Sequence, residues 1–126
     1  MAKIIIVEDD INLANVYRDR LVEDKHEVSI VQDKEAISAI KVQKPDLVLL
    51  DVMMPNISGI QILKSIRSDK DFENTPVLML TNDEKAGDME LAIEMGIEGY
   101  ILKAETDINA LAFRVQSIFE ERKVIP

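Results

Sequence analysis

The stretch Leu47-Val48-Leu49-Leu50-Asp51-Val52-Met53-Met54-Pro55 decides the fold of this chain. Its apolar first part is typical of a buried strand, and the proline at its end breaks regular structure. Asp51 therefore lies where the strand ends, at the carboxyl edge of a sheet. Because ligands bind at that edge in open α/β folds, Asp51 is the first candidate functional residue.

Similar short apolar runs recur along the chain and alternate with longer amphipathic segments. The predicted strands are Lys3–Val7, Glu27–Val31, Asp46–Leu50, Pro76–Leu80 and Gly99–Leu102. Four of them are almost continuously aliphatic, as is typical of parallel strands covered on both faces. The regular alternation predicts right-handed βαβ units, and hence an α/β fold with a five-stranded parallel sheet between two layers of helices.

The segments between the strands carry apolar residues at helical spacing. The predicted helices begin after Asp10, near Asp33, after Gly59, near Glu84, and at Thr106 or Asp107. Asp10 is the expected N-cap of the first helix. The fourth helix should point Met89, Ala92 and Ile93 inward and end at Gly96.

Composition narrows the class of protein. The 126 residues suit a single domain, 1–126. A formal net charge of -9 argues against direct binding to nucleic acid or to anionic lipid. The absence of cysteine excludes disulfides and thiolate chemistry. No apolar stretch approaches the roughly 20 residues that cross a bilayer, and the first strand leaves no room for a signal peptide, so we expect a cytoplasmic protein.

A second acidic group follows a predicted strand. Glu8 and Asp9 directly follow the run Lys3–Val7, just as Asp51 directly follows the apolar run 47–50. Carboxylates brought together repel one another unless a cation neutralises them, and hard oxygen ligands suit Mg²⁺. A metal there would screen an incoming phosphoryl group, so that the aspartate could attack it as a nucleophile.

Two more strands end in polar residues of the kind that phosphoryl chemistry uses. Thr81 follows Leu78-Met79-Leu80 and offers a hydroxyl group, and Lys103 follows Tyr100-Ile101-Leu102 and offers a fixed positive charge. Both should face the same crevice as the acids, since the carboxyl ends of parallel strands meet at one edge.

Over essentially its full length the chain resembles the receiver domain of two-component response regulators. The motifs that carry the resemblance are Val7-Glu8-Asp9, Leu50-Asp51-Val52-Met53-Met54-Pro55 with Gly59, Leu80-Thr81, and Gly99-Tyr100-Ile101-Leu102-Lys103. Together and in this order they are very specific. The resemblance implies a flavodoxin-like (βα)5 fold with strand order 2-1-3-4-5.

The resemblance also implies a set of residues that hold a metal. Asp51 matches the phosphoacceptor and a Mg²⁺ ligand, and Asp9 matches the direct carboxylate ligand. Glu8 matches its water-mediated partner, and Met53 matches the residue whose backbone carbonyl completes the site.

The implied activity is that of a signalling switch. Thr81 matches the switch hydroxyl, Lys103 the phosphoryl-binding ammonium group, and Tyr100 the aromatic residue whose rotamer reports phosphorylation. The implied donor is a histidine kinase or phosphotransfer protein. Such a domain catalyses its own phosphorylation and dephosphorylation without being a classical enzyme, and it changes partners, or forms a homodimer, through the face of the fourth helix, fifth strand and fifth helix.

Two positions depart from the family pattern. Ala104 stands where a proline usually follows the lysine in a cis peptide, so we expect a trans bond or a strained loop there. Asn82 stands where a small residue usually follows the threonine, and we expect Asn82→Ala to speed dephosphorylation because the smaller side chain widens the route for water.

Several alternatives stay open. A receiver-like module could bind partners constitutively, but no acid or lysine of the motif is missing. A small phosphatase or flavin carrier would need a second general acid or a glycine-rich phosphate loop, and neither is found.

The placement of some residues also stays open. Leu91, Met95 and Phe113 either edge the core or form a partner surface. His26, the single histidine, is expected at the surface. An output domain after residue 126 is compatible with the sequence.

Overall fold

The computed structural model describes residues 2–82 and 87–124. Its sheet is formed by β1 (Lys3–Val7), β2 (Glu27–Val31), β3 (Leu47–Asp51), β4 (Val77–Thr81) and β5 (Gly99–Leu102). All neighbouring strands are parallel, and their order is β2-β1-β3-β4-β5. The predicted flavodoxin-like arrangement is confirmed.

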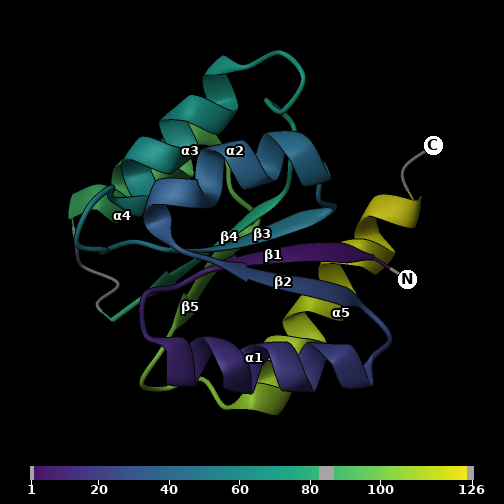
Figure 1. Cartoon of the computed structure of the whole chain (residues 1–126). Helices are drawn as coiled ribbons and strands as arrows, with labels where there is room; N and C mark the ends of the chain where they lie inside the picture. The colour runs from purple at the N-terminus through teal and green to yellow at the C-terminus, as the bar shows by residue number, and fades with distance from the viewer. Residues whose placement is uncertain (1, 83–86, 125–126) are drawn as a thin grey trace.

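Helices connect the strands in the predicted alternation. They are α1 (Ile11–Glu23), α2 (Asp33–Gln43), α3 (Gly59–Ser68), α4 (Gly87–Met95) and α5 (Ile108–Val124). The expected start of the fourth helix near Glu84 lies outside the described residues. Figure 1 shows α2, α3 and α4 on one face of the sheet and α1 with α5 on the other.

The strand boundaries differ by one residue from the sequence prediction at two places. β3 and β4 each begin and end one residue later than expected, so Asp51 and Thr81 are the last residues of their strands. Pairing continues to this point, because Asp51 lies opposite Leu80 and Thr81 lies opposite Leu102. Both side chains are therefore held by sheet backbone, which restricts their positions more than a loop would.

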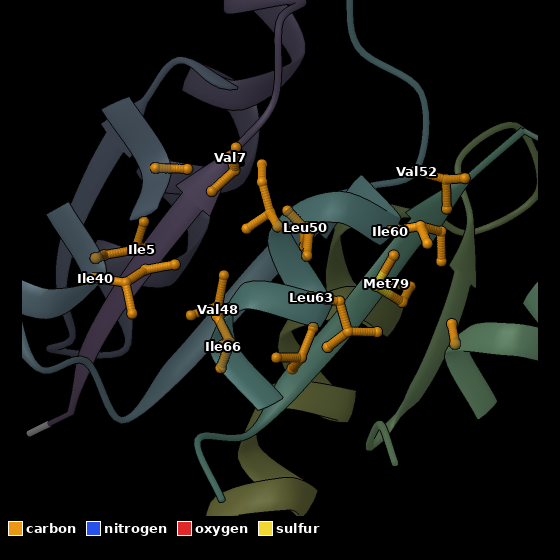
Figure 2. Close-up of a cluster of buried hydrophobic side chains, with 14 of the residues drawn as sticks. Ile5, Val7, Ile40, Val48, Leu50, Val52, Ile60, Leu63, Ile66 and Met79 are labelled. Atoms are coloured by element: carbon orange, nitrogen blue, oxygen red, sulfur yellow. The ribbon is translucent and has the colours of Figure 1, made fainter. Parts of the chain in front are cut away.

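Alternate residues of the central strands supply two hydrophobic cores. Val48 and Leu50 point toward α2, α3 and α4, where they pack with Ile40 and Leu63 as Figure 2 shows. Leu47, Leu49, Leu78 and Leu80 point to the other face and pack against α1 and α5. Apolar residues at every position of β3 and β4 up to their polar ends thus fill both cores, as the continuous apolar runs predict.

Turn and cap chemistry defines the ends of the helices. The Asp10 carboxylate accepts a hydrogen bond from the Leu13 backbone N–H at 3.2 Å, which confirms it as the N-cap of α1. The Asp107 carboxylate accepts from the Ala110 N–H at 2.8 Å at the start of α5. Gly96 follows the last residue of α4 with a φ of 87°, a conformation that favours glycine.

The prediction that Ile93 points into the core is wrong. Of the three residues that could either edge the core or form a surface, two do the first and one does the second. Ile93 is 57% exposed, because Met89 and Ala92 already cover the inward face of the short helix α4. Leu91 and Met95 pack at the edge of the core. Phe113, on α5, is 75% exposed and belongs to the surface. Within the described residues, no helix is both long and apolar enough to cross a membrane.

Candidate metal and phosphoryl site

The carboxyl edge of the sheet brings three acids together. One oxygen from each of Glu8, Asp9 and Asp51 lies within 4.8 Å of the others. The strand order explains this, because β1 and β3 are neighbours and their last paired residues are Val7 and Leu50. Glu8 and Asp51 are buried, whereas Asp9 is exposed.

Lys103 enters the same cluster from β5. Its Nζ atom lies 2.6 Å from Glu8 Oε1 and 2.9 Å from Asp51 Oδ1, and its side chain is 11% exposed. A nearly buried ammonium group between two buried carboxylates is well placed to stabilise both. The predicted meeting of the acids and the lysine is therefore observed.

The turn after Lys103 is regular without a proline. No peptide bond among the described residues is cis, so the bond between Lys103 and Ala104 is trans. This is the first of the two conformations expected for this position. The Lys103 backbone N–H donates to the Thr81 carbonyl at 2.8 Å, and the N–H groups of Glu105 and Thr106 donate to the Leu102 carbonyl at 3.2 and 3.0 Å. These backbone hydrogen bonds aim the lysine.

The donor set fits a hard divalent cation. Glu8 is held by the protein through both oxygens, since Oε2 accepts a hydrogen bond from the Asp10 N–H at 3.1 Å while Oε1 contacts Lys103. Asp9 presents an exposed carboxylate beside Asp51. With all three acids ionised and one lysine present, two negative charges remain unbalanced. Oxygen donors with this charge suit Mg²⁺.

Burial and mutual charge shift the pKa values within the cluster. Burial raises the pKa of Asp51 to about 7, and the nearby charge of Glu8 adds to this, although Lys103 acts in the opposite direction. Burial also acts to lower the pKa of Lys103, but the hydrogen bonds and charges of Glu8 and Asp51 outweigh it and raise the pKa overall. Slight burial acts to raise the pKa of Asp9, but its interactions with the neighbouring Glu8 and Asp51 carboxyl groups and the charge of Lys103 outweigh this and lower the pKa overall. The cluster is thus short of positive charge.

The remaining predicted residues lie around this cluster. Thr81 is buried at the end of β4, next to the strand that carries Lys103. Asn82 follows it and is exposed. Tyr100, 36% exposed, lies on β5, and Met53 lies in the segment after β3 with a side chain that is 76% exposed.

Gly59 shapes the backbone behind Asp51. Its N–H donates to the Val52 carbonyl at 2.9 Å. A Cβ atom at Gly59 would lie 2.1 Å from the Asp51 carbonyl oxygen. No other residue type fits such a close approach of two backbones, so the glycine of the motif has a steric reason.

Asp33 is predicted from the sequence only as the start of the second helix, so its contacts with the loop after the phosphoacceptor candidate are missed. Its side chain is buried, with 3% exposed, and hydrogen bonds from Asn56 and Ile57 hold it to the segment after Asp51. Backbone hydrogen bonds lower the pKa of this carboxyl, against the opposing effect of burial. A signal existed, because Asp33 is an acid that follows a predicted strand at the same edge of the sheet.

The expectation that His26 lies at the surface holds only in part. The residue is half-buried, both ring nitrogens are buried, and its ring lies 5.3 Å from that of Phe119. His26 precedes β2, and Phe119 of α5, which is distant along the sequence, packs against its ring. The polar neighbours Asp24 and Lys25 concealed this in the sequence, because the covering helix is distant along the chain.

Comparison with known proteins identifies this arrangement. The family model of the response regulator receiver domain matches residues 4–116. The chain belongs to this family. The domain is consistent with a phosphoacceptor switch, and the acids, the lysine and the threonine lie at the strand ends where the family motifs placed them.

The relatives that match the chain are named as transcriptional or response regulators. The chain is 31% identical over 125 residues to the alkaline phosphatase synthesis transcriptional regulatory protein PhoP of Bacillus subtilis, covering 97% of this chain and 50% of that protein. It is 33% identical over 102 residues to the DNA-binding response regulator MtrA of Mycobacterium tuberculosis, covering 80% of this chain and 43% of that protein. The receiver chain thus spans about half the length of these relatives.

Solved receiver structures share the fold. The chemotaxis response regulator CheY4 of Vibrio cholerae superposes with a TM-score of 0.85 at 26% identity, covering 94% of this chain and 98% of that one. The signal receiver domain of a histidine kinase from Syntrophus aciditrophicus gives a TM-score of 0.87 at 26% identity, covering 100% and 96%.

Proposed function

We propose that this receiver domain is a Mg²⁺-dependent phosphoacceptor switch in which Asp51 takes a phosphoryl group from the phosphohistidine of a kinase or phosphotransfer protein. The observation that carries the proposal is the position of Lys103 Nζ, which contacts both Glu8 and Asp51 beside the exposed carboxylate of Asp9. This is the constellation that a phosphoryl group requires: a carboxylate nucleophile, a fixed cation and free metal ligands.

In the reaction, an Asp51 carboxylate oxygen attacks phosphorus while the bond from phosphorus to the imidazole nitrogen breaks. The imidazole leaves and carries the electron pair of that bond, and Asp51 becomes an acyl phosphate. Lys103 binds a phosphoryl oxygen and thereby exchanges part of its contact with Asp51 for the new anion. Bound Mg²⁺, held by Asp9, Asp51 and the Met53 carbonyl with Glu8 behind, would supply charge neutralisation at the phosphoryl oxygens.

The response spreads through the residues next to the acceptor. The added charge draws the Thr81 hydroxyl toward the phosphoryl group, and Tyr100 turns inward into the space that Thr81 leaves. The surface of α4, β5 and α5 then changes its partner or pairs with a second copy. We propose a cytoplasmic module that makes no direct contact with nucleic acid. Any DNA binding, such as the name of the relative MtrA states for that protein, would then belong to a separate output domain.

The test is intact mass spectrometry after incubation with acetyl phosphate and Mg²⁺, with and without chelator. Wild type should gain one phosphoryl group only when Mg²⁺ is present, and Asp51→Asn should gain none. Lys103→Ala and Thr81→Ala should accept label but lose the change at Tyr100, seen by its NMR signals. Wild type that binds a kinase equally with and without label, or that takes no label from acetyl phosphate or a kinase, would favour the constitutive binding module.

A further inference from the structure

Asp33 is a buried carboxylate with an unusual number of hydrogen bonds. Oδ2 accepts from the backbone N–H groups of Asn56 and Ile57 at 2.8 and 3.0 Å. Oδ1 accepts from the Asn56 side-chain amide at 3.2 Å and from the Lys34 N–H at 2.8 Å. Hydrogen bonds to an ionised acceptor are about twice as strong as neutral ones, so this is a firm attachment.

The attachment joins α2 to the segment that follows the phosphoacceptor, residues 52–58. Both ends of this segment are already fixed: the Val52 N–H donates to the Leu80 carbonyl, and the Gly59 N–H donates back to the Val52 carbonyl, each at 2.9 Å. Across the described part of the chain, the hydrogen bonds that hold the middle of the segment to another element are those to Asp33.

A simpler explanation is that Asp33 only favours the helix start. A carboxylate in the first turn of a helix interacts well with the helix dipole. The Lys34 N–H bond serves that role, but the other three donors come from Asn56 and Ile57, which lie outside α2. The arrangement therefore does more than stabilise the start of a helix.

We propose that Asp33 is a positioning residue for the metal site. By fixing Asn56 and Ile57 it holds the segment in which Met53 lies, and so sets where the Met53 carbonyl stands relative to Asp51. The inference rests on the proposed function, because it concerns the geometry of the Mg²⁺ ligands assigned there. Asp33 itself touches neither metal nor phosphoryl group.

The test is Mg²⁺ binding to the full chain, measured by isothermal titration calorimetry and by NMR shifts of residues around Asp51. Asp33→Asn keeps the shape but turns an amide NH₂ toward N–H donors, and should weaken Mg²⁺ binding on the order of 10-fold, as loss of an outer partner of a metal site typically does. Asn56→Ala removes one of the three bonds and should weaken binding less, in the same direction.

The matched control is Ile40→Val, which loosens the packing of α2 and leaves the hydrogen bonds between Asp33 and residues 52–58 in place. It should lower stability and leave the Mg²⁺ dissociation constant unchanged. Acetyl phosphate labelling gives a second readout. Asp33→Asn should need a higher Mg²⁺ concentration than wild type for half-maximal labelling. Its labelling rate should be reduced less at saturating Mg²⁺ than at limiting Mg²⁺.

The outcomes separate the two proposals. Weaker Mg²⁺ binding in Asp33→Asn and Asn56→Ala, but not in Ile40→Val, supports positioning. Equal affinity in all folded variants overturns it, and should Asp33→Asn not fold, an unchanged affinity in Asn56→Ala does the same. Wild type that binds Mg²⁺ without ever taking label would overturn the phosphoacceptor function alone, whereas wild type without Mg²⁺ binding would overturn both.

Discussion

At the scale of single residues, the backbone contact between Gly59 and Asp51 is the tightest restriction on the site. We predict that Gly59→Ala lowers the free energy of unfolding by about 1–3 kcal/mol, because the added methyl group forces the two backbones apart. Labelling of Asp51 should slow as well, since its carbonyl must move. Urea denaturation and intact mass measure these effects.

Gly87→Ala is the matched control for this substitution. Gly87 begins α4, and no atom lies within 4 Å of a Cβ built there. The control should keep its stability or gain up to about 1 kcal/mol, because alanine favours a helix more than glycine does. Equal stability of the Gly59 and Gly87 variants would contradict the steric argument.

A further prediction for a single residue concerns Asn82 and rests on the sequence alone. It is exposed and directly follows Thr81. We expect Asn82→Ala to dephosphorylate faster than wild type, because the smaller side chain opens a path for the attacking water. The measurement is the decay of the phosphorylated mass after removal of acetyl phosphate, and a rate equal to or below that of wild type would disprove the idea.

At the scale of elements, Arg67 joins three parts of the chain. From α3 its guanidinium group donates to the Thr75 carbonyl at 2.9 Å and to the Gly96 carbonyl at 2.7 Å, and Nε also reaches the Met95 carbonyl at 3.2 Å. Partial burial lowers its pKa, yet the group stays charged. The end of α4 and the entry to β4 are therefore held by one side chain.

We predict that Arg67→Gln lowers the free energy of unfolding by about 1.5–3 kcal/mol, the usual loss for hydrogen bonds to a charged group. Amide hydrogen exchange in α4 should rise more than in α1. Arg18→Gln is the control, because Arg18 pairs with its exposed neighbour Asp19 and should matter by less than about 1 kcal/mol. Uniform exchange across α1 and α4 would contradict a specific restraint on α4.

Elements were the most predictable level of this molecule. Apolar runs and helical spacing located every strand and helix that the structure describes. β3 and β4 each lie one residue later than predicted, and α5 begins at Ile108 instead of at Thr106 or Asp107. Periodicity could not say that pairing with Leu80 and Leu102 extends those strands. It also placed Ile93 wrongly, because a short helix buries fewer positions than its apolar pattern offers.

Contacts between distant segments were not predictable in the same way. The acids, Thr81 and Lys103 could be named because each lies at or directly after the end of a strand, and parallel strands share an edge. Met53 and Tyr100 were named from the family resemblance alone. Asp33 and Arg67 act through backbone groups of loops, and a single sequence carries no signal for which carbonyl or N–H group lies near. His26 escaped for the same reason, since its cover is Phe119 from the last helix.

At the scale of the whole molecule, the burial of His26 links stability to pH. Burial lowers the pKa of His26, and Asp24 opposes this only in part. The folded state therefore resists the proton that the unfolded state takes up near pH 6.5. Below that pH the unfolded chain binds more protons, so stability should fall as the pH drops from about 7 toward 5.

We predict that this part of the pH dependence disappears in His26→Gln. The difference in the free energy of unfolding between wild type and variant should grow with rising pH between about 5 and 7, and level off above. Urea denaturation in a series of buffers measures it. A difference that stays constant across this range would show that His26 does not titrate as its burial requires.

The strand order has a consequence for how the protein is made. The acids of the site belong to β1 and β3, but the ammonium group that compensates them arrives with β5, at residue 103 of 126. A growing chain that stops after β4 has no partner for the open edge of that strand and no lysine among its carboxylates. Since unpaired edges recruit other chains, products of stalled translation that end before Lys103 should self-associate.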